Sequence, residues 1–336
     1  MSVQPGPATA LSMSSATPAI EAVELSKRYG EVQALDGLSI AVAPGTVFGL
    51  LGPNGAGKST AVKILTTLAR PDSGSATVAG IDVLRRPDAV RRAIGVVTQR
   101  SGVDPVATGR ENLQLIGRIH GMRGGEIKAR TAELLDRFEL TEHADRPART
   151  YSGGMQRKLD VAMGLIHRPQ VLFLDEPTTG LDPEARSQMW QEISRLTGAE
   201  SLSILLTTHY LEEADQLAAE LAIVDRGRIV AAGTPEQLKA GLRGDAIVVE
   251  LADEVATAKA ATALRAVPGA REITADGHTA RARVDAGASA LPAVLAGLEQ
   301  AGVLVASATV ARPSLDDVYL RHAGRAFAAA HEQEVA

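Results

Sequence analysis

The sequence contains no cysteine, and aromatic residues make up only 3% of its 336 positions. Without cysteine, disulfide scaffolds, thiolate zinc sites and cysteine nucleophiles are excluded. So few aromatic side chains also argue against a platform on which nucleic-acid bases stack. Basic residues number 35 against 40 acidic ones, whereas nucleic-acid binders usually carry a basic excess. We therefore expect no nucleic-acid partner.

Long hydrophobic runs are missing as well. No apolar stretch approaches the roughly 18 residues that a membrane-spanning helix needs. With 45% hydrophobic and 22% charged residues, the composition is that of an ordinary folded protein. The length suggests about two domains.

Short apolar runs alternate with helical patterns over much of the chain, which predicts an α/β class with buried parallel strands. Residues 1–19 are rich in Pro, Ser, Ala and Thr, and we expect them to form a disordered tail. The stretch 104–168 has helical periodicity without a convincing strand, so we interpret it as a helical insertion. The expected strands are 20–25, 38–43, 47–51, 94–97, 171–174, 203–207 and 221–225, with turns at 27–30 and 36–37 and a helix at 61–69.

The composition changes after Pro235, and the remaining residues predict a second, smaller α+β domain. Strands and helices follow one another in the order βαββαβ, which is the ferredoxin-like pattern. The strands are expected at 245–251, 271–275, 279–284 and 303–310, and the helices at 253–267 and 287–301. Asp276 and Gly277 form a good hairpin turn between the second and third strands. We place the main domain at 20–238, the accessory domain at 239–325 and a tail at 326–336.

The strongest motif is the sequence GPNGAGKST at 52–60, which follows an apolar strand and opens a helix. This is the context required of a phosphate-binding loop. A glycine-rich turn lets successive backbone N–H groups point at one anion, and the helix N-terminus adds its dipole. In this motif Lys58 would reach the β and γ phosphates, and Ser59 would ligate Mg²⁺.

A second motif consists of two acids, Asp175 and Glu176, that follow four apolar residues. Such a run places the acids at the exposed end of a buried strand. A carboxylate there can hold Mg²⁺, directly or through water. Its neighbour can polarise an attacking water, so we expect metal binding from Asp175 and base chemistry from Glu176.

A third motif, Ser152 followed by Gly153 and Gly154, indicates another helix start. Ser152 is a good N-cap, and the glycines leave the N–H groups of the first turn unshielded. The sequence therefore predicts a second anion-binding helix start. The phosphate loop alone does not explain why one protein should hold phosphate in two places.

These motifs, together with Gln99, Asp182 and His209, occur in the order found in ATP-binding cassette (ABC) nucleotide-binding domains, and the chain resembles that family over about residues 20–235. The resemblance implies a P-loop NTPase fold with a RecA-like core, an antiparallel β subdomain and a helical subdomain at about 104–168. It implies ATP hydrolysis with ATP and Mg²⁺ as cofactors. It also implies a head-to-tail dimer, in which the phosphate loop of one copy faces the signature helix of a second copy.

The resemblance further assigns roles to single residues. Glu176 would be the general base, with Lys58, Gln99 and His209 as the other catalytic residues, and Asp182 would lie in the dimer contact. Tyr29 would stack on adenine. Mg²⁺ would be held by Ser59, Gln99 and Asp175. The nucleotide would be bound by Tyr29, Gly52, Pro53, Asn54, Gly55, Ala56, Gly57, Lys58, Ser59, Thr60, Gln99, Ser152, Gly153, Gly154, Gln156, Asp182 and His209.

The sequence RPSLDDVYL at 312–320, followed by Gly324 and Arg325, resembles the C-terminal end of the daunorubicin-resistance group of drug-export ATPases. This implies an ATP-hydrolysing subunit of an ABC-2 type exporter that energises efflux of a drug or antibiotic. The chain would sit at the cytoplasmic side of the cell membrane through a separate permease subunit, which would bind between Gln99 and about Met122. Two alternatives stay open: the same motor exporting a lipid, polysaccharide or peptide, and a soluble ABC ATPase without a transport role.

Overall fold

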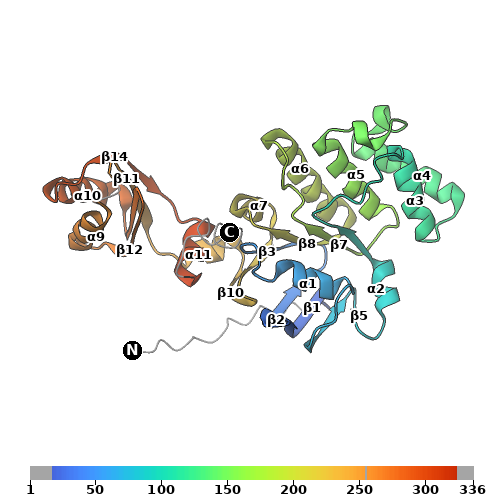
Figure 1. Cartoon of the computed structure of the whole chain (residues 1–336), viewed down its shortest axis with the longest axis horizontal. Helices are drawn as coiled ribbons and strands as arrows, with labels where there is room; N and C mark the ends of the chain where they lie inside the picture. Colours follow the sequence, from blue (N-terminus) through green and yellow to red (C-terminus); the bar gives the residue numbers. More distant parts are fainter. Residues whose placement is uncertain (1–16, 254–255, 324–336) are drawn as a thin grey trace. The chain divides into compact units, whose positions relative to one another are not determined.

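The computed structural model describes residues 17–253 and 256–323, and the chain divides into two compact units (Figure 1). The first unit contains the residues up to Pro235 together with those from His322 on, and the second is Glu236–Arg321. Most of the expected tail at 1–19 and all of the expected tail at 326–336 lie outside the described residues. No helix in the described part of the chain is long and apolar enough to cross a lipid bilayer.

A six-stranded sheet with the order β10-β9-β3-β8-β7-β6 forms the core of the first unit. Its parallel strands are β3 (Val47–Leu51), β6 (Ile94–Val97), β7 (Val171–Asp175), β8 (Ser203–Thr208) and β9 (Glu220–Asp225). The apolar runs predict all five of these strands. They do not predict β10 (Arg228–Gly233), an antiparallel edge strand whose side chains are only partly buried.

The parallel strands are buried on both faces because alternate side chains join two different hydrophobic clusters. On β7, Phe173 packs with residues of α1 (Lys58–Leu65) and of a smaller antiparallel sheet. Leu172 and Leu174 pack instead with residues of α5 (Gly153–Leu165) and α6 (Pro183–Glu200). Burial on both faces explains why these strands are continuous apolar runs rather than alternating ones.

The smaller antiparallel sheet has the order β2-β1-β4-β5. It consists of β1 (Ile20–Tyr29), β2 (Val32–Val42), β4 (Ser73–Val78) and β5 (Ile81–Asp82). The turn predicted at 27–30 is confirmed only at Gly30, which turns the chain together with Glu31, because Lys27 pairs with Leu35 and Tyr29 with Val32. The turn predicted at 36–37 is wrong, because both residues lie within β2. The pairing of β1 with β2 and the 2.8 Å ion pair between Lys27 and Asp72 override the weak strand propensity of the polar residues.

The first unit contains further helices besides α1, α5 and α6. They are α2 (Pro87–Ala93), α3 (Gly109–Ile119), α4 (Gly124–Arg137), α7 (Leu211–Leu217) and the first residue of α8 (Pro235–Ala240). Short 3₁₀ turns occur at Thr141–His143 and Ala148–Thr150. As predicted, residues 104–168 hold helices and no strand, and α3, α4 and α5 lie together in Figure 1.

The second unit contains a four-stranded antiparallel sheet with the order β12-β13-β11-β14. Its elements are β11 (Asp245–Leu251), α9 (Thr257–Ala266), β12 (Arg271–Asp276), β13 (Thr279–Val284), α10 (Gly287–Gln300) and β14 (Val305–Ala311). This order of a βαββαβ chain confirms the ferredoxin-like pattern. Side chains of α9 and α10 cover one face, where Leu264 and Leu298 join a cluster with Ile247 and Val249 of β11.

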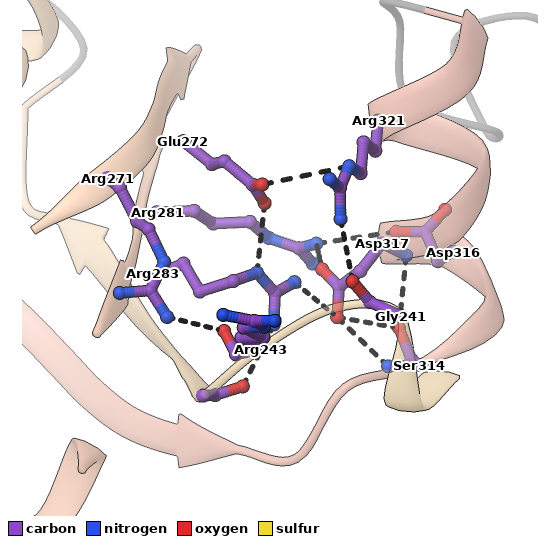
Figure 2. Close-up of polar contacts among 11 residues, drawn as sticks. Gly241, Arg243, Arg271, Glu272, Arg281, Arg283, Ser314, Asp316, Asp317 and Arg321 are labelled. Carbon is purple, nitrogen blue, oxygen red and sulfur yellow. Dashed lines mark hydrogen bonds and ion pairs between the residues drawn. The ribbon is translucent and has the colours of Figure 1, made fainter. Parts of the chain in front are cut away.

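Helix α11 (Leu315–Ala323) is held to the other face of this sheet by ion pairs (Figure 2). Ser314 and Asp317 cap the helix, since the Ser314 N–H donates to Asp317 Oδ2 at 3.0 Å and the Asp317 N–H donates to Ser314 Oγ at 3.2 Å. Asp317 Oδ2 also lies 3.4 Å from Arg283 Nη2, and only 4% of Arg283 is exposed. Arg283 Nε reaches Glu272 Oε2 at 3.0 Å. The RPSLDDVYL sequence thus encodes a capped helix with a buried ionic anchor.

The substitution Asp317→Asn should lower the free energy of unfolding of the second unit by about 2–3 kcal/mol, because it leaves Arg283 buried with one negative partner fewer. Asp316→Asn is the matched control, because Asp316 is more exposed and makes a single 3.3 Å contact with Arg281. This control should cost less than about 1 kcal/mol. Urea denaturation of the full chain, followed by circular dichroism, measures both. Equal losses for the two variants would contradict the buried anchor.

Candidate functional site

The predicted catalytic residues lie at the carboxyl ends of neighbouring parallel strands. The glycine-rich loop follows β3, Gln99 follows β6, Glu176 follows β7 and His209 follows β8. Because β6, β7, β8 and β3 are neighbours in the sheet, residues from distant parts of the sequence meet at one edge. This edge is where open α/β sheets place their ligands.

The loop needs glycine at two positions for steric reasons. Gly57 has a φ of 110°, and a Cβ atom there would lie 2.4 Å from the Ala34 carbonyl oxygen. A Cβ atom on Gly52 would lie 2.4 Å from the Val224 carbonyl oxygen. Gly57 is also the N-cap residue of α1 and supplies no side-chain cap. The N–H groups of the first turn therefore remain directed at an acceptor outside the helix, as in an anion site.

Lys58 links this loop to the acid at the end of β7. Its Nζ donates to the Gly52 carbonyl at 2.6 Å and to the Pro53 carbonyl at 2.9 Å. It also lies 3.9 Å from Glu176 Oε1, and only 4% of Lys58 is exposed. The ammonium group is therefore held between the loop and the candidate base, where it can contact a bound phosphate.

The Glu176 carboxylate lies at the centre of these contacts. Its Oε1 is 3.1 Å from His209 Nδ1, and its Oε2 accepts a hydrogen bond from Gln99 Nε2 at 3.2 Å. Burial alone raises the pKa of Glu176, but the hydrogen bond and charge of His209, with the charge of Lys58, outweigh it and hold the pKa below its usual range. Glu176 is therefore ionised at neutral pH and able to accept a hydrogen bond from water.

The backbone of Glu176 is also unusual. Its φ is 50°, in the left-handed region that non-glycine residues rarely adopt. The Glu176 N–H donates to the Thr207 carbonyl of β8 at 3.1 Å, which fixes this conformation. Such strain is common where a side chain must be aimed at a reacting group.

The predicted metal ligands supply the right chemistry for Mg²⁺. Asp175 lies at the end of β7, where its carboxylate accepts a hydrogen bond from Thr207 Oγ1. Ser59 is exposed on the first turn of α1. Carboxylate, hydroxyl and amide oxygens are ligands that Mg²⁺ accepts, and it takes the rest from phosphate and water. Among the described residues, no three His, Asp or Glu side chains form a protein-only metal cluster.

The signature residues form a separate group between α5 and α6. Ser152 and Gly154 line a hollow of about 160 Å³ together with Asp182. Ser152 Oγ accepts a hydrogen bond from the Met155 N–H at 3.2 Å, which confirms the predicted N-cap. Asp182 caps α6 in the same way, accepting from the Ala185 N–H at 2.8 Å.

The remaining predicted binding residues lie at the edges of these two groups. Tyr29 is 48% exposed at the end of β1, with Lys27 Nζ 5.4 Å from its ring centre. Gln156 Nε2 donates to the Ala148 carbonyl at 3.4 Å. Nothing lies within 4 Å of the Cβ position of Gly153 among the described residues. The other loop residues, which are Pro53, Asn54, Gly55, Ala56 and Thr60, lie before or within the first turn of α1.

Sequence reasoning missed Arg157, an arginine on α5 that is only 8% exposed. It ties the signature helix to the catalytic loops, because its guanidinium donates to backbone carbonyls that flank Gln99 and Glu176. These are the carbonyls of Thr98 at 2.8 Å, Asp175 at 3.2 Å, Glu176 at 3.1 Å and Pro177 at 2.7 Å. The sequence gives no local signal, because Arg157 stands between Gln156 and Lys158 in a polar part of the helix.

Comparison with known proteins gives two matching family models. One is described as ABC transporter and matches residues 35–179, and the other as ATP-binding protein DrrA1-3-like, C-terminal domain, and matches residues 233–323. The daunorubicin resistance ATP-binding protein DrrA2 of Streptomyces coeruleorubidus is 47% identical over 307 residues, which is 91% of this chain and 95% of the relative.

Another relative, whose name gives a different transported molecule, is also similar to this chain. The Nod factor export ATP-binding protein I of Ralstonia nicotianae is 40% identical over 312 residues, which is 92% of this chain and 95% of the relative. Among solved structures, cbiO1 of Clostridium perfringens, described as part of the ABC transporter complex cbiONQ, has a TM-score of 0.63 at 25% identity. The match covers 67% of this chain and 92% of that chain.

The substitution Arg157→Lys should lower the turnover number for ATP by at least about tenfold, because a lysine cannot reach all the carbonyls that the guanidinium holds. ATP binding should change little, since Arg157 lies behind the catalytic loops. Release of phosphate and binding of a fluorescent ATP analogue measure the two effects. Arg168→Lys is the control, because Arg168 is 68% exposed. If Arg157→Lys hydrolysed ATP at the wild-type rate, the hydrogen bonds from Arg157 to the four backbone carbonyls would be unnecessary for catalysis.

Proposed function

Because this chain belongs to the ABC transporter ATP-binding proteins of the daunorubicin-resistance group, we propose that it drives an exporter that moves a drug or antibiotic out of the cell. The chain is an ATPase, so the proposal concerns the cargo, the partner and the roles of single residues. The observation that supports the chemistry is the ionised Glu176 carboxylate, held between His209, Gln99 and Lys58. The observation that supports drug export is the similarity of both units to daunorubicin-resistance proteins.

Transfer of a phosphoryl group to water needs positioning and charge neutralisation more than covalent chemistry. Lys58 and the N–H groups at the start of α1 would neutralise the phosphates. Glu176 would accept a hydrogen bond from the attacking water and orient it, while Gln99 and His209 keep its carboxylate aimed. Mg²⁺ held by Ser59, Asp175 and Gln99 would supply positive charge at the phosphate oxygens when bound.

We further propose that two copies of the chain act as a head-to-tail pair. The signature residues form a group of their own beside Asp182 rather than a part of the Glu176 cluster. The open space around Gly153 leaves the start of α5 accessible to an anion. In a head-to-tail pair, Ser152, Gly153 and Gly154 of one copy would contact the γ-phosphate held by the other.

The membrane permease subunit would bind in a groove of about 720 Å³ beside the catalytic loops. The groove is lined by Thr98 and by exposed apolar side chains, among them Ile119 at 69% and Leu68 at 68% exposure. Part of its lining, including Ile116, Ile119 and His120, belongs to the predicted coupling region between Gln99 and Met122, and the rest comes mainly from α2, β6 and α5. The permease would then hold this chain at the cytoplasmic side of the cell membrane.

Two stacked histidines keep part of this groove uncharged. The rings of His120 and His167 lie 3.6 Å apart and nearly parallel. Burial lowers the pKa of His120, and burial together with His120 lowers the pKa of His167 to about 4. Both rings are therefore neutral at physiological pH. Other parts of the groove carry charged side chains, which are Asp88, Arg91, Arg92 and Asp160.

A second candidate keeps the same motor but changes the cargo to a lipid, polysaccharide or peptide. It is favoured by the 40% identity to a Nod factor export protein over both units. The ATPase site cannot distinguish the two, because the same catalytic residues would serve either cargo. Drug efflux from cells that express the chain with its permease distinguishes them.

The substitution Glu176→Gln should retain ATP binding but lower turnover by at least about 100-fold, because the amide cannot accept a proton from the attacking water. Glu126→Gln on the exposed face of α4 is the control. Nucleotide binding and phosphate release measure the two properties. In cells, wild-type chain with its permease should lower the accumulation of a fluorescent anthracycline, and Glu176→Gln should not. Robust multiple turnover by purified Glu176→Gln would overturn the assignment of the base.

The substitution Ile119→Glu should weaken the complex with the permease by about tenfold or more, because it places an unpaired charge in an apolar contact. Leu304→Glu is the matched control, because Leu304 is 75% exposed but belongs to the second unit. Co-purification of tagged permease from detergent-solubilised membranes measures the complex. Normal co-purification of Ile119→Glu would place the permease elsewhere.

A further inference from the structure

Glu213 is a fully buried acid that the chemistry above does not use. It lies on α7, shortly after His209, and 0% of the residue is exposed. Its Oε1 accepts two hydrogen bonds, from Thr178 Oγ1 at 2.7 Å and from Trp190 Nε1 at 3.1 Å. A buried carboxyl group is costly unless it is hydrogen-bonded, and these two donors, together with the side chain of Thr208, offset that cost.

One donor lies within the segment that joins the candidate base to the dimer contact, and the other lies on the helix that follows it. Thr178 follows Glu176 closely in the sequence, on the way to Asp182. Trp190 lies on α6, the helix that Asp182 caps. Glu213 therefore links the segment, through Thr178, and the helix that follows it, through Trp190, to α7, the helix that follows His209.

A second bridge links the same elements through partly buried side chains. The Arg186 guanidinium of α6 lies 4.9 Å from the centre of the Tyr210 ring. The Tyr210 ring lies 4.2 Å from the ring of His209. Because the aromatic bridge is partly buried and lacks directional hydrogen bonds, whereas Glu213 is fully buried and accepts two of them, the Glu213 contacts fix the geometry more strictly.

We propose that Glu213 is a positioning residue for ATP hydrolysis, which holds the segment from Glu176 to Asp182 in place relative to His209. This inference rests on the proposed function, because it concerns the same ATPase site. Without Glu213, Thr178 and Trp190 both lose their acceptor, and the 3.1 Å contact between Glu176 and His209 loses its support. A movement of Asp182 on dimer closure would also pass to Glu176 through this anchor.

The chain carries its own probe of this anchor, because Trp190 is its only tryptophan. The indole N–H donates directly to Glu213. Intrinsic fluorescence excited at the tryptophan band therefore reports on this one contact, with or without nucleotide.

The test compares Glu213→Ala, Glu213→Gln and the exposed neighbour variant Glu212→Gln in the full chain. Glu213→Ala should change the emission of Trp190 and lower kcat by at least about tenfold, with the KM for ATP within about twofold of wild type. Burial raises the pKa of Glu213, so a neutral amide is a close replacement. Glu213→Gln, whose amide oxygen accepts the same two hydrogen bonds, should restore most of the emission and of kcat. Glu212→Gln should match wild type.

A second pair of variants covers the case in which Glu213→Ala fails to fold. Thr178→Val removes one donor and should lower kcat in the same direction, whereas Thr178→Ser keeps the hydroxyl and should not. A changed Trp190 emission with wild-type kcat in Glu213→Ala or Thr178→Val would show a contact that only stabilises the fold, and would overturn the inference. An inactive wild-type protein with normal Trp190 emission would instead count against the proposed function.

Discussion

Glu176 must remain ionised although it is largely withdrawn from water, and much of the first unit serves this requirement. Desolvation favours the neutral acid, so nearby donors and positive charge must outweigh it. His209 and Lys58 supply them, while Gln99 also donates a hydrogen bond to the carboxylate, and the three residues follow three different strands. Only a sheet with these strands as neighbours brings the loops together, which is why the order β6, β7, β8, β3 is a functional constraint as well as a packing solution.

The loops around Glu176 are held by buried polar side chains from the helices on one side of the sheet. Arg157 binds the carbonyls on either side of the base from α5, and Glu213 binds Thr178 from α7. Both side chains are costly to bury, and both offset this cost by satisfying groups that would otherwise lack a partner. These side chains therefore fix the catalytic loops on the side that faces α5 and α7. The side that faces the phosphate loop stays available for a nucleotide.

Local sequence patterns predicted much of this arrangement. The continuous apolar strands, the glycine loop, the Ser152 cap and the βαββαβ order depend on neighbours in sequence, and each was correct. The errors concern features set by pairing between strands. Residues 27–29 extend β1 because they pair with β2, and β4 and β5 form from small polar residues that the pairing with β1 stabilises. The roles proposed for the single site residues remain predictions, because they depend on bound nucleotide and a second copy.

Arg157 and Glu213 escaped detection for a related reason. In a hydropathy pattern, an arginine or a glutamate marks the exposed face of a helix. Nothing local shows that the partner of Arg157 is a set of carbonyls after β6 and β7, or that Glu213 meets the indole of Trp190. Buried charged residues whose partners lie far along the chain are thus the part of a site that is hardest to predict from a single sequence.

The position of Arg157 also bears on how a partner could act on the site. Thr98 lines the apolar groove, and its carbonyl accepts a hydrogen bond from Arg157. The same guanidinium binds the carbonyl of Glu176. A segment that enters the groove and shifts Thr98 must therefore either move the guanidinium or break one of its hydrogen bonds. In both cases the backbone that aims Glu176 is disturbed, so one buried side chain gives a physical route from the groove to the catalytic site.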